Sequence, residues 1–356
     1  LTELRKEILN NKTIVEIVYK WKFETVIADT MTILYRNISL DNYDFSIRNR
    51  PYFDSISVSK SEILEHPYCE FRGYDSLLVK DIVNSIKTNS RPLCEFAKTT
   101  SGIGGKSDLI TPHRIHDNQV EVVKGKSIDR YKILKKYYFT FNEKNITGRT
   151  KDKTKLSKRE KILLRKTGSY LISTFDFTGV FPEQSLYFLY DFNIKSKYLL
   201  ALLNSKLFTW YYQNRLVTNE DSTPQLKNFD LDSFPIKETK HVSDFVYFVN
   251  CILYLKGKDL NSIDDQFIPT FFEQIIDGMV YELYFPELLK KHNREIIKYL
   301  GVLPEFNDSL STEKKMVICK ETFNRLNEKD HPVRRNLFYM NSIPEIALIE
   351  GGNENN

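Results

Sequence analysis

The sequence has few of the residues that build metal sites or disulfide frameworks. Its four cysteines are widely separated, at Cys69, Cys94, Cys251 and Cys319. Structural zinc sites and disulfide scaffolds use closely paired cysteines, so this spacing favours free thiols in a reducing cytoplasm. His113 and His116 lie three positions apart, but no cysteine or carboxylate completes a ligand pattern around them. The pair therefore favours a loop or strand edge over a metal site.

Long apolar runs are also missing. No stretch approaches the length needed to span a bilayer, and the mean hydropathy is −0.41. The first residues, Leu1-Thr-Glu-Leu-Arg-Lys-Glu, lack the apolar core of a signal peptide, and the chain does not begin with methionine. With 356 residues, 41% of them hydrophobic, the chain is long enough for two or three domains with a substantial core. We expect a globular cytoplasmic protein that is a piece of a longer polypeptide.

Catalytic and cofactor motifs are incomplete. Gly102-Ile-Gly104-Gly105 lacks the third glycine of a dinucleotide-binding loop, because Ser107 occupies that position. Its glycines instead favour a sharp turn or a close approach of the backbone to DNA, with Lys106 as the adjacent cation. No cluster of carboxylates with a lysine is flanked by strands in the manner of a nuclease site. The residues of this chain therefore predict no catalytic group, no metal and no bound cofactor.

Positive charge is concentrated in one part of the chain. Residues 124–166 contain 16 Lys and Arg against 4 Asp and Glu, a net charge of 16 − 4 = +12. The whole chain carries +5, so the remainder carries 5 − 12 = −7. A patch of this kind can neutralise phosphates and orient a protein on a duplex. We therefore expect nucleic acid as the partner.

The aromatic residues of this basic stretch and its charged run each have two interpretations. Aromatic residues are interleaved with the cations; they are Tyr131, Tyr137, Tyr138, Phe139 and Phe141. They could stack on exposed bases, but a buried strand is the favoured interpretation because aromatic residues suit strands. The charged run from Lys151 to Lys161 is either a solvated loop or a recognition loop held by a rigid scaffold.

Apolar periodicity predicts an alternation of short strands and helices, which indicates an α/β (mixed α+β) fold. Strands are predicted at residues 13–19, 25–35, 107–110, 120–123, 137–141, 169–175 and 186–190. Helices are predicted at residues 4–10, 74–87, 197–215, 242–256, 268–300 and 313–326, the fifth interrupted at Phe285-Pro286. The helix at 272–285 is interpreted as a packing element. The Gly-Gly-Asn-Glu-Asn-Asn end is predicted to be disordered.

One ordered series of motifs carries more information than any of its pieces. Lys161-Ile-Leu-Leu-Arg165-Lys166-Thr167-Gly168-Ser169-Tyr170-Leu leads through Phe181-Pro-Glu-Gln-Ser-Leu-Tyr187 to Lys197-Tyr-Leu-Leu-Ala-Leu-Leu-Asn204-Ser205-Lys206. Before it stand Ser101-Gly-Ile-Gly-Gly-Lys106 and Lys124-Gly-Lys126-Ser-Ile-Asp-Arg130-Tyr131, and after it come Pro224-Gln-Leu-Lys227 and Phe234-Pro-Ile236. This series resembles the C-terminal specificity domain of the TaqI-like adenine-N6 DNA methyltransferases, found also in fused restriction-modification enzymes of the Eco57I type.

The resemblance implies an architecture. Residues 1–40 would be the C-terminal end of a methyltransferase-like α/β domain, and residues 41–90 a connecting helical region. Residues 91–236 would form the target recognition domain. Residues 237–330 would be a helical extension, and residues 331–356 a partly disordered tail. The catalytic lobe that binds S-adenosylmethionine would lie upstream in the same bacterial or archaeal polypeptide, together with a nuclease in the fused enzymes.

The resemblance also implies the partner, which is double-stranded DNA, with base flipping delivering an adenine to the upstream lobe. No membrane is expected as a partner. The residues expected to contact DNA are Ser101, Gly102, Lys106, Lys124, Lys126, Arg130, Tyr131, Arg165, Lys166, Thr167 and Gly168. Their cations would bind phosphates or pair with guanine in the major groove.

Two other functions remain open at this point. One is the specificity subunit of a multisubunit restriction-modification system, although such subunits usually contain two recognition domains and no internal repeat is evident here. The other is a non-enzymatic protein that binds RNA or single strands through its basic stretch. Competition between duplex DNA and RNA would separate the last from the first.

Overall fold

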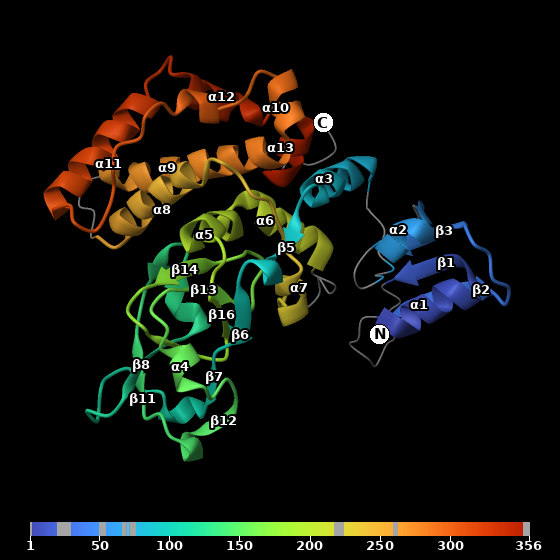
Figure 1. The fold of residues 1–356 in the computed structure, drawn as a ribbon, viewed down its shortest axis with the longest axis horizontal. Coiled ribbons are helices and arrows are strands. Elements are labelled where there is room, and N and C mark those ends of the chain that lie inside the picture. The colour runs from blue at the N-terminus through green and yellow to red at the C-terminus, as the bar shows by residue number, and fades with distance from the viewer. Residues whose placement is uncertain are drawn as a thin grey trace. The chain divides into compact units, whose positions relative to one another are not determined.

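The structure, a computed structural model, describes residues 2–19, 30–49, 55–65, 69, 71, 76–216, 224–258 and 263–351. The chain divides into two compact units, Leu1–Asn84 and Ser85–Asn356 (Figure 1). Several small sheets occur together with a series of helices toward the C-terminus, so the predicted mixed α+β class is confirmed. Within the described residues, no helix combines the length and the apolar character needed to cross a membrane.

The first unit is built on a four-stranded sheet. Its strand order is β2 (Met31–Arg36), β1 (Thr13–Tyr19), β3 (Asp44–Asn49) and β4 (Ser55–Ser59). Helix α1 (Thr2–Asn11) precedes the sheet and α2 (Lys60–Glu65) follows it. Only the β1 and β3 pair is parallel among these strands. Leu9, Ile14, Ile17, Phe45, Ile47 and Val58 form the core of this unit.

The sequence predicted part of this unit and missed part. The helix at residues 4–10 and the strand at residues 13–19 are confirmed. The next strand begins at Met31, and residues 25–29 of its predicted range lie outside the described residues. The region 41–90 was expected to be a helical connection. It contains α2 and α3 (Leu77–Lys87), but also β3 and β4, because alternating Phe45 and Ile47 on β3 face the core while their neighbours do not.

The centre of the second unit is an antiparallel sheet in the order β14 (Ser173–Asp176), β13 (Lys161–Arg165), β16 (Leu186–Tyr190) and β6 (Lys98–Ser101). Every residue of β16 is buried, and so are the first four of β13. Near-continuous apolar runs of this kind form strands that are covered on both faces. The sheet has two ends of different character: Ser101, Arg165 and Leu186 lie at one end, and Lys98, Lys161, Asp176 and Tyr190 at the other.

Smaller elements surround this sheet. A second sheet has the order β11 (Tyr137–Phe139), β8 (Val120–Val123) and β15 (Phe181–Pro182). Three strand pairs are β12 (Ile146–Arg149) with β7 (Ile103–Gly105), β10 (Lys132–Ile133) with β9 (Ile128–Asp129), and β17 (Pro235–Ile236) with β5 (Arg91–Pro92). Short helices are η1 (Leu93–Glu95), η2 (Ser107–Leu109), η3 (Gly125–Ser127), η4 (Glu143–Asn145), α4 (Lys153–Leu156) and α7 (Asn228–Asp232). The predicted strand at 107–110 is therefore wrong, because Leu109 is exposed and only Ile110 is buried there.

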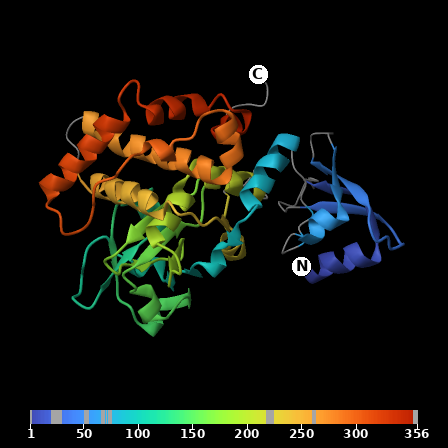
Figure 2. The ribbon, with the colours of Figure 1, turned by 45° about the horizontal axis from the view of Figure 1, so that its top comes forward.

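Helices lie in layers over the central sheet. The predicted helix at 197–215 is two helices, α5 (Ser196–Asn204) and α6 (Lys206–Tyr211), followed by a π-helical turn, Tyr212–Leu216. The break falls at Ser205, whose extended backbone caps α6 through a hydrogen bond from the Phe208 amide to the Ser205 hydroxyl. Helices α8 (Val242–Lys256) and α9 (Ile263–Tyr284) run side by side and cover α5 and α6 (Figures 1 and 2).

The C-terminal region is more regular than its polar composition predicts. After α10 (Pro286–Lys291) and η6 (Ile297–Tyr299) come α11 (Thr312–Leu326), α12 (Pro332–Met340) and α13 (Pro344–Ile349). Residues 332–349, expected to belong to a partly disordered tail, are thus mostly helical. Val333, Met340, Ile343 and Ile346 are buried, which explains why this stretch is ordered. Residues 352–356 lie outside the described residues.

Candidate nucleic-acid interface

Three lysines lie close to Tyr137, two of them in the basic segment (residues 124–131) and one just after it. The Lys124 ammonium lies 4.9 Å from the centre of the Tyr137 ring, and that of Lys135 lies 5.2 Å from it. A hydrogen bond with Ser127 lowers the pKa of Tyr137, which partial burial opposes; Lys135, Lys126 and Lys124 lower it further. Lys126 and Lys135 are exposed, so this lysine cluster (Lys124, Lys126 and Lys135) presents positive charge to the solvent. Lys135 was not among the expected site residues.

The backbone beneath this cluster is held from two sides. Arg165 donates from Nε to the Gly125 carbonyl (2.9 Å) and from Nη2 to the Ile128 carbonyl (2.6 Å). On the other side the Gly125 amide donates to Ser185 Oγ (2.7 Å), which itself donates to Glu183 (2.5 Å). Arg165 was expected to contact DNA. Its half-buried guanidinium fixes the segment through these two bonds, and DNA contact by Arg165 stays a prediction.

Arg130 and Tyr131 join the segment to the helical layer. Arg130 Nη2 lies 3.0 Å from a Glu273 carboxylate oxygen on α9. Lys256 of α8 lies 2.5 Å from the other oxygen and donates to the Arg130 carbonyl (3.1 Å). Burial acts to lower the pKa of Arg130, but Glu273 and other negative neighbours raise it overall. The Arg130 charge is therefore compensated within the protein.

Tyr131 lies in the interior beside this ion-pair network. Its φ angle is +63° and its side chain is 2% exposed, with Lys256 5.5 Å from the ring centre. Its amide donates to the Ser173 carbonyl at the start of β14 (3.0 Å). Burial raises the pKa of the Tyr131 phenol strongly, so the phenol stays neutral. The aromatic ring serves packing at this position, and the predicted DNA contact by Tyr131 has no solvent-facing group to make it.

A buried carboxylate completes the junction between the segment and α9. Asp277 lies one turn after Glu273 and accepts a hydrogen bond from the Lys206 amide at the start of α6 (2.8 Å). Burial raises the pKa of Asp277 to about 7, against the charge of Arg130. The α9 helix was interpreted from its sequence as packing only. The signal that could have been read is a pair of acids four residues apart, Glu273 and Asp277, which places both on one face of the helix.

A second group of predicted residues meets at the end of β6. Lys166 donates to the Ser101 hydroxyl, lies 4.3 Å from the centre of the Tyr187 ring, and is 5% exposed. Burial, and after it the positive charge of Arg149, lower the pKa of Lys166 to about 8, while Glu183 opposes them. Arg149 itself is exposed with a φ of +64°. The solvent-facing cation at this point is thus Arg149, which the sequence did not single out.

The remaining predicted residues lie around the lysine cluster and around the pair formed by Ser101 and Lys166. Lys106 is exposed, and its amide donates to the Asn145 carbonyl (3.0 Å). Thr167 is exposed and forms a backbone bridge with Gln225, while the Gly168 amide donates to the Pro224 carbonyl (3.0 Å) at a φ of +126°. Motifs that are dispersed along the sequence therefore converge at one end of the central sheet. DNA contact by Lys106, Thr167 and Gly168 stays a prediction.

Gly102 has a role that does not involve a ligand. A Cβ atom there would lie 2.3 Å from the Pro182 carbonyl oxygen and 2.4 Å from that of Glu183. We expect Gly102→Ala to lower the free energy of unfolding by about 1–3 kcal/mol, because backbone would have to shift. Urea titration measures this. Gly148→Ala is the control, since nothing lies within 4 Å of its Cβ position, and equal stabilities of the two variants would contradict the steric explanation.

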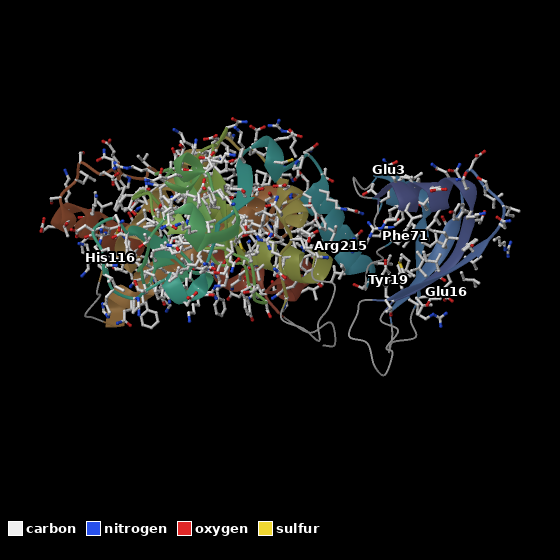
Figure 3. All side chains as sticks on the ribbon, turned by 90° about the horizontal axis from the view of Figure 1, so that it is seen from below. Glu3, Glu16, Tyr19, Phe71, His116 and Arg215 are labelled. Atoms are coloured by element: carbon white, nitrogen blue, oxygen red, sulfur yellow. The ribbon has the colours of Figure 1, made fainter. Side chains whose placement is uncertain are left out.

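No metal centre is evident in the part of the chain that the structure describes, where no three His, Cys, Asp or Glu side chains are placed to hold an ion. His116 lies in an exposed loop before β8 (Figure 3), and the Gln119 side chain accepts hydrogen bonds from the amides of Ile115 and His116. The four cysteines are free, and all but Cys94 are buried.

Comparison with known proteins gives one family match. The family model described as "TaqI-like C-terminal specificity domain" matches residues 120–236, about a third of the chain. No curated protein matches the sequence. The matched range contains the lysine cluster, Arg130, Tyr131 and Arg165 to Gly168, whereas Ser101, Gly102 and Lys106 precede it.

Solved structures with some similarity come from restriction-modification systems. The type IIG restriction endonuclease BpuSI has 12% sequence identity, covers 80% of this chain and 45% of its own, and gives a TM-score of 0.37. The type IIL restriction-modification enzyme MmeI, in complex with DNA, has 10% identity, coverages of 89% and 46%, and a TM-score of 0.42. The type I S subunit from M. genitalium has 15% identity, coverages of 60% and 49%, and a TM-score of 0.30. The chain spans about half the length of these proteins.

The motif series and the family match overlap from residue 124 to residue 236. Both include the basic segment, the Arg165 to Gly168 strand end and the closing Phe234-Pro-Ile236. Residues 120–236 of this chain therefore match the TaqI-like C-terminal specificity domain both in the order of their motifs and by the family model.

Proposed function

We propose that this chain recognises a specific sequence in double-stranded DNA as part of a restriction-modification enzyme. The observation that carries the proposal is the lysine cluster, which lies inside the matched specificity domain on a backbone fixed by Arg165 and Ser185. Exposed lysines bind phosphates and position a protein on a duplex, while base contacts supply the sequence preference. Exposed Arg149 and Thr167, at the same end of the central sheet, are the candidates for base contacts.

The wider role follows from the resemblance to adenine-N6 methyltransferases. In this proposal a second lobe of the same polypeptide binds S-adenosylmethionine and receives a flipped adenine, and the enzyme works in the cytoplasm. Fused enzymes of this type also contain a nuclease. The residues of this chain would then supply the position on DNA, and the other lobe the chemistry.

The proposal is tested by binding of fluorescent random-sequence duplex DNA across a salt series. We expect the double variant Lys124→Ala/Lys126→Ala to bind more weakly and to reduce the slope of log K against log salt by about 2, since each lost phosphate contact removes about 1. Lys290→Ala/Lys291→Ala, two exposed lysines on α10, is the control for general charge. Selection of bound sequences from the pool then tests for a preferred site.

Two results would contradict the proposal. One is an unchanged affinity and salt slope in the Lys124 and Lys126 variant. The other is duplex binding that yields no enriched sequence, because a specificity domain must discriminate among sites. Preferential binding of RNA over duplex in competition would favour the single-strand alternative.

A further inference from the structure

A second surface lies at the opposite end of the central sheet from the lysine cluster. Two adjoining hollows of about 790 and 420 Å³ share Arg159, Glu160 and Lys195. We call them together the distal groove. It is bordered by the segment before β13, the chain that follows β16, and the start of α5. The sheet separates this groove from the Ser101 and Arg165 end.

The distal groove has an excess of positive charge. Four cations line it (Lys158, Arg159, Lys195 and Lys197) against two carboxylates (Glu160 and Asp191). Asp191 is already neutralised, because it accepts hydrogen bonds from Lys158 and Lys98, and these lower its pKa. Glu160 accepts a hydrogen bond from the Ser196 hydroxyl (2.7 Å). Arg159 and Lys195 are exposed, and within the described residues neither is paired with an acidic side chain.

An aromatic side chain stands exposed beside these cations. Phe177, which lines the smaller hollow, is 72% exposed. The Lys197 ammonium lies 5.4 Å from the centre of the neighbouring Phe175 ring. This side of the groove therefore already combines a cation with an aromatic face. An exposed phenylalanine next to exposed cations is the combination that binds bases and phosphates together.

The turn that carries Phe177 is fixed from inside the protein. The Asp176 carboxylate accepts hydrogen bonds from the Thr178 amide (2.9 Å), the Thr178 hydroxyl (2.7 Å) and the Gly179 amide (3.1 Å). The same carboxylate lies 3.0 Å from Lys161, and both side chains are fully buried. Because the turn is ordered before any ligand arrives, binding would not have to pay for ordering it.

We propose that the distal groove binds single-stranded nucleic acid, with Arg159 and Lys195 on the backbone phosphates and Phe177 stacked on a base. A duplex would satisfy the cations but would leave Phe177 uncovered, because the faces of its bases are hidden in the stack. A single strand offers both groups at once. This site is separate from the duplex surface and does not depend on the function proposed above.

The test uses a fluorescein-labelled oligothymidylate of about 15 nucleotides, long enough for a site of this kind, and measures fluorescence anisotropy. We expect Phe177→Ala to weaken binding roughly 5- to 100-fold, the range found for loss of one stacked base. Phe338→Ala is the matched control, since Phe338 is 76% exposed on α12 and does not line the groove. Thermal unfolding of both variants confirms that they are folded.

Charge reversal provides the second arm. Arg159→Glu/Lys195→Glu should weaken oligothymidylate binding and flatten its salt dependence, whereas Lys290→Glu/Lys291→Glu should leave both unchanged. The Lys124→Ala/Lys126→Ala variant should still bind the oligonucleotide, and the groove variants should still bind duplex. These cross-checks separate failure of the groove from failure of duplex recognition.

Unchanged oligonucleotide affinity in both groove variants would overturn the proposal. So would a result in which an acidic peptide binds through Phe177 while the oligonucleotide does not, because the groove would then be a surface for a protein partner.

Discussion

Lys161→Met is expected to lower the free energy of unfolding by about 3–5 kcal/mol, the effect of removing one partner from a buried ion pair. Lys161 and Asp176 are fully buried and 3.0 Å apart, and Lys161 also donates to the carbonyls of Leu156 (2.8 Å) and Lys158 (2.6 Å). Burial lowers the pKa of Lys161, against the opposing effect of Asp176. Methionine has a similar length but no charge, so the variant would leave the Asp176 carboxylate buried without its partner.

Urea unfolding monitored by circular dichroism measures this loss. Lys158→Met is the control, because Lys158 pairs with Asp191 at the surface, where both side chains are about one-third exposed and a pair contributes about 0–1 kcal/mol. The double variant Lys161→Met/Asp176→Leu should be more stable than Lys161→Met alone, since it removes the isolated charge. Equal losses of unfolding free energy in the Lys161 and Lys158 variants would show that the buried pair stabilises the protein no more than the surface pair does.

Glu273→Ala is expected to loosen the basic segment, although Glu273 lies far from that segment along the chain, on α9. Glu273 is the common partner of Arg130 and Lys256, and its removal leaves two adjacent cations uncompensated. Because these side chains are partly exposed, we expect a loss of about 2–3 kcal/mol, between the values for surface and buried pairs. Amide hydrogen exchange at residues 124–131 should accelerate, since the segment loses its attachment to α8 and α9.

The control is Gln274→Ala, which changes the neighbouring exposed residue on the same helix. If the segment is positioned for recognition, Glu273→Ala should reduce discrimination among DNA sequences while non-specific affinity is maintained or increased, because the variant gains positive charge. A loss of specific and non-specific binding in the same proportion would indicate general unfolding. Unchanged hydrogen exchange at 124–131 would contradict the positioning role.

Several parts of the fold could be predicted from the sequence because their signals are local. The apolar runs of β13 and β16 are buried strands, and the periodic residues of α8 form a helix with the predicted bounds. The concentration of charge in 124–166 is likewise a property of composition. The order of short motifs was enough to indicate the specificity domain that the family match supports.

Other predictions failed where distant contacts decide the outcome. The polar C-terminal region forms helices because Ile343 and Ile346 are buried there, and local composition does not report such packing. Residues 107–110 form a short helical turn instead of a strand, since the amides of Leu109 and Ile110 donate to carbonyls three residues earlier in the chain. Ser205 divides a periodic helix in two by capping its second half.

For the candidate site, too, some features follow from the sequence and others only from the tertiary structure. The sequence by itself determined which cations are present, how they are clustered along the chain and which family motif they belong to. Only the tertiary structure decided their surroundings: Arg165 and Arg130 are half-buried and bonded to other groups of the protein, Lys166 is covered by Tyr187, and Lys126 faces solvent. The physical reason is that a buried charge needs an opposite charge close to it in space, and Glu273, the acidic partner of Arg130, comes from a helix far along the chain.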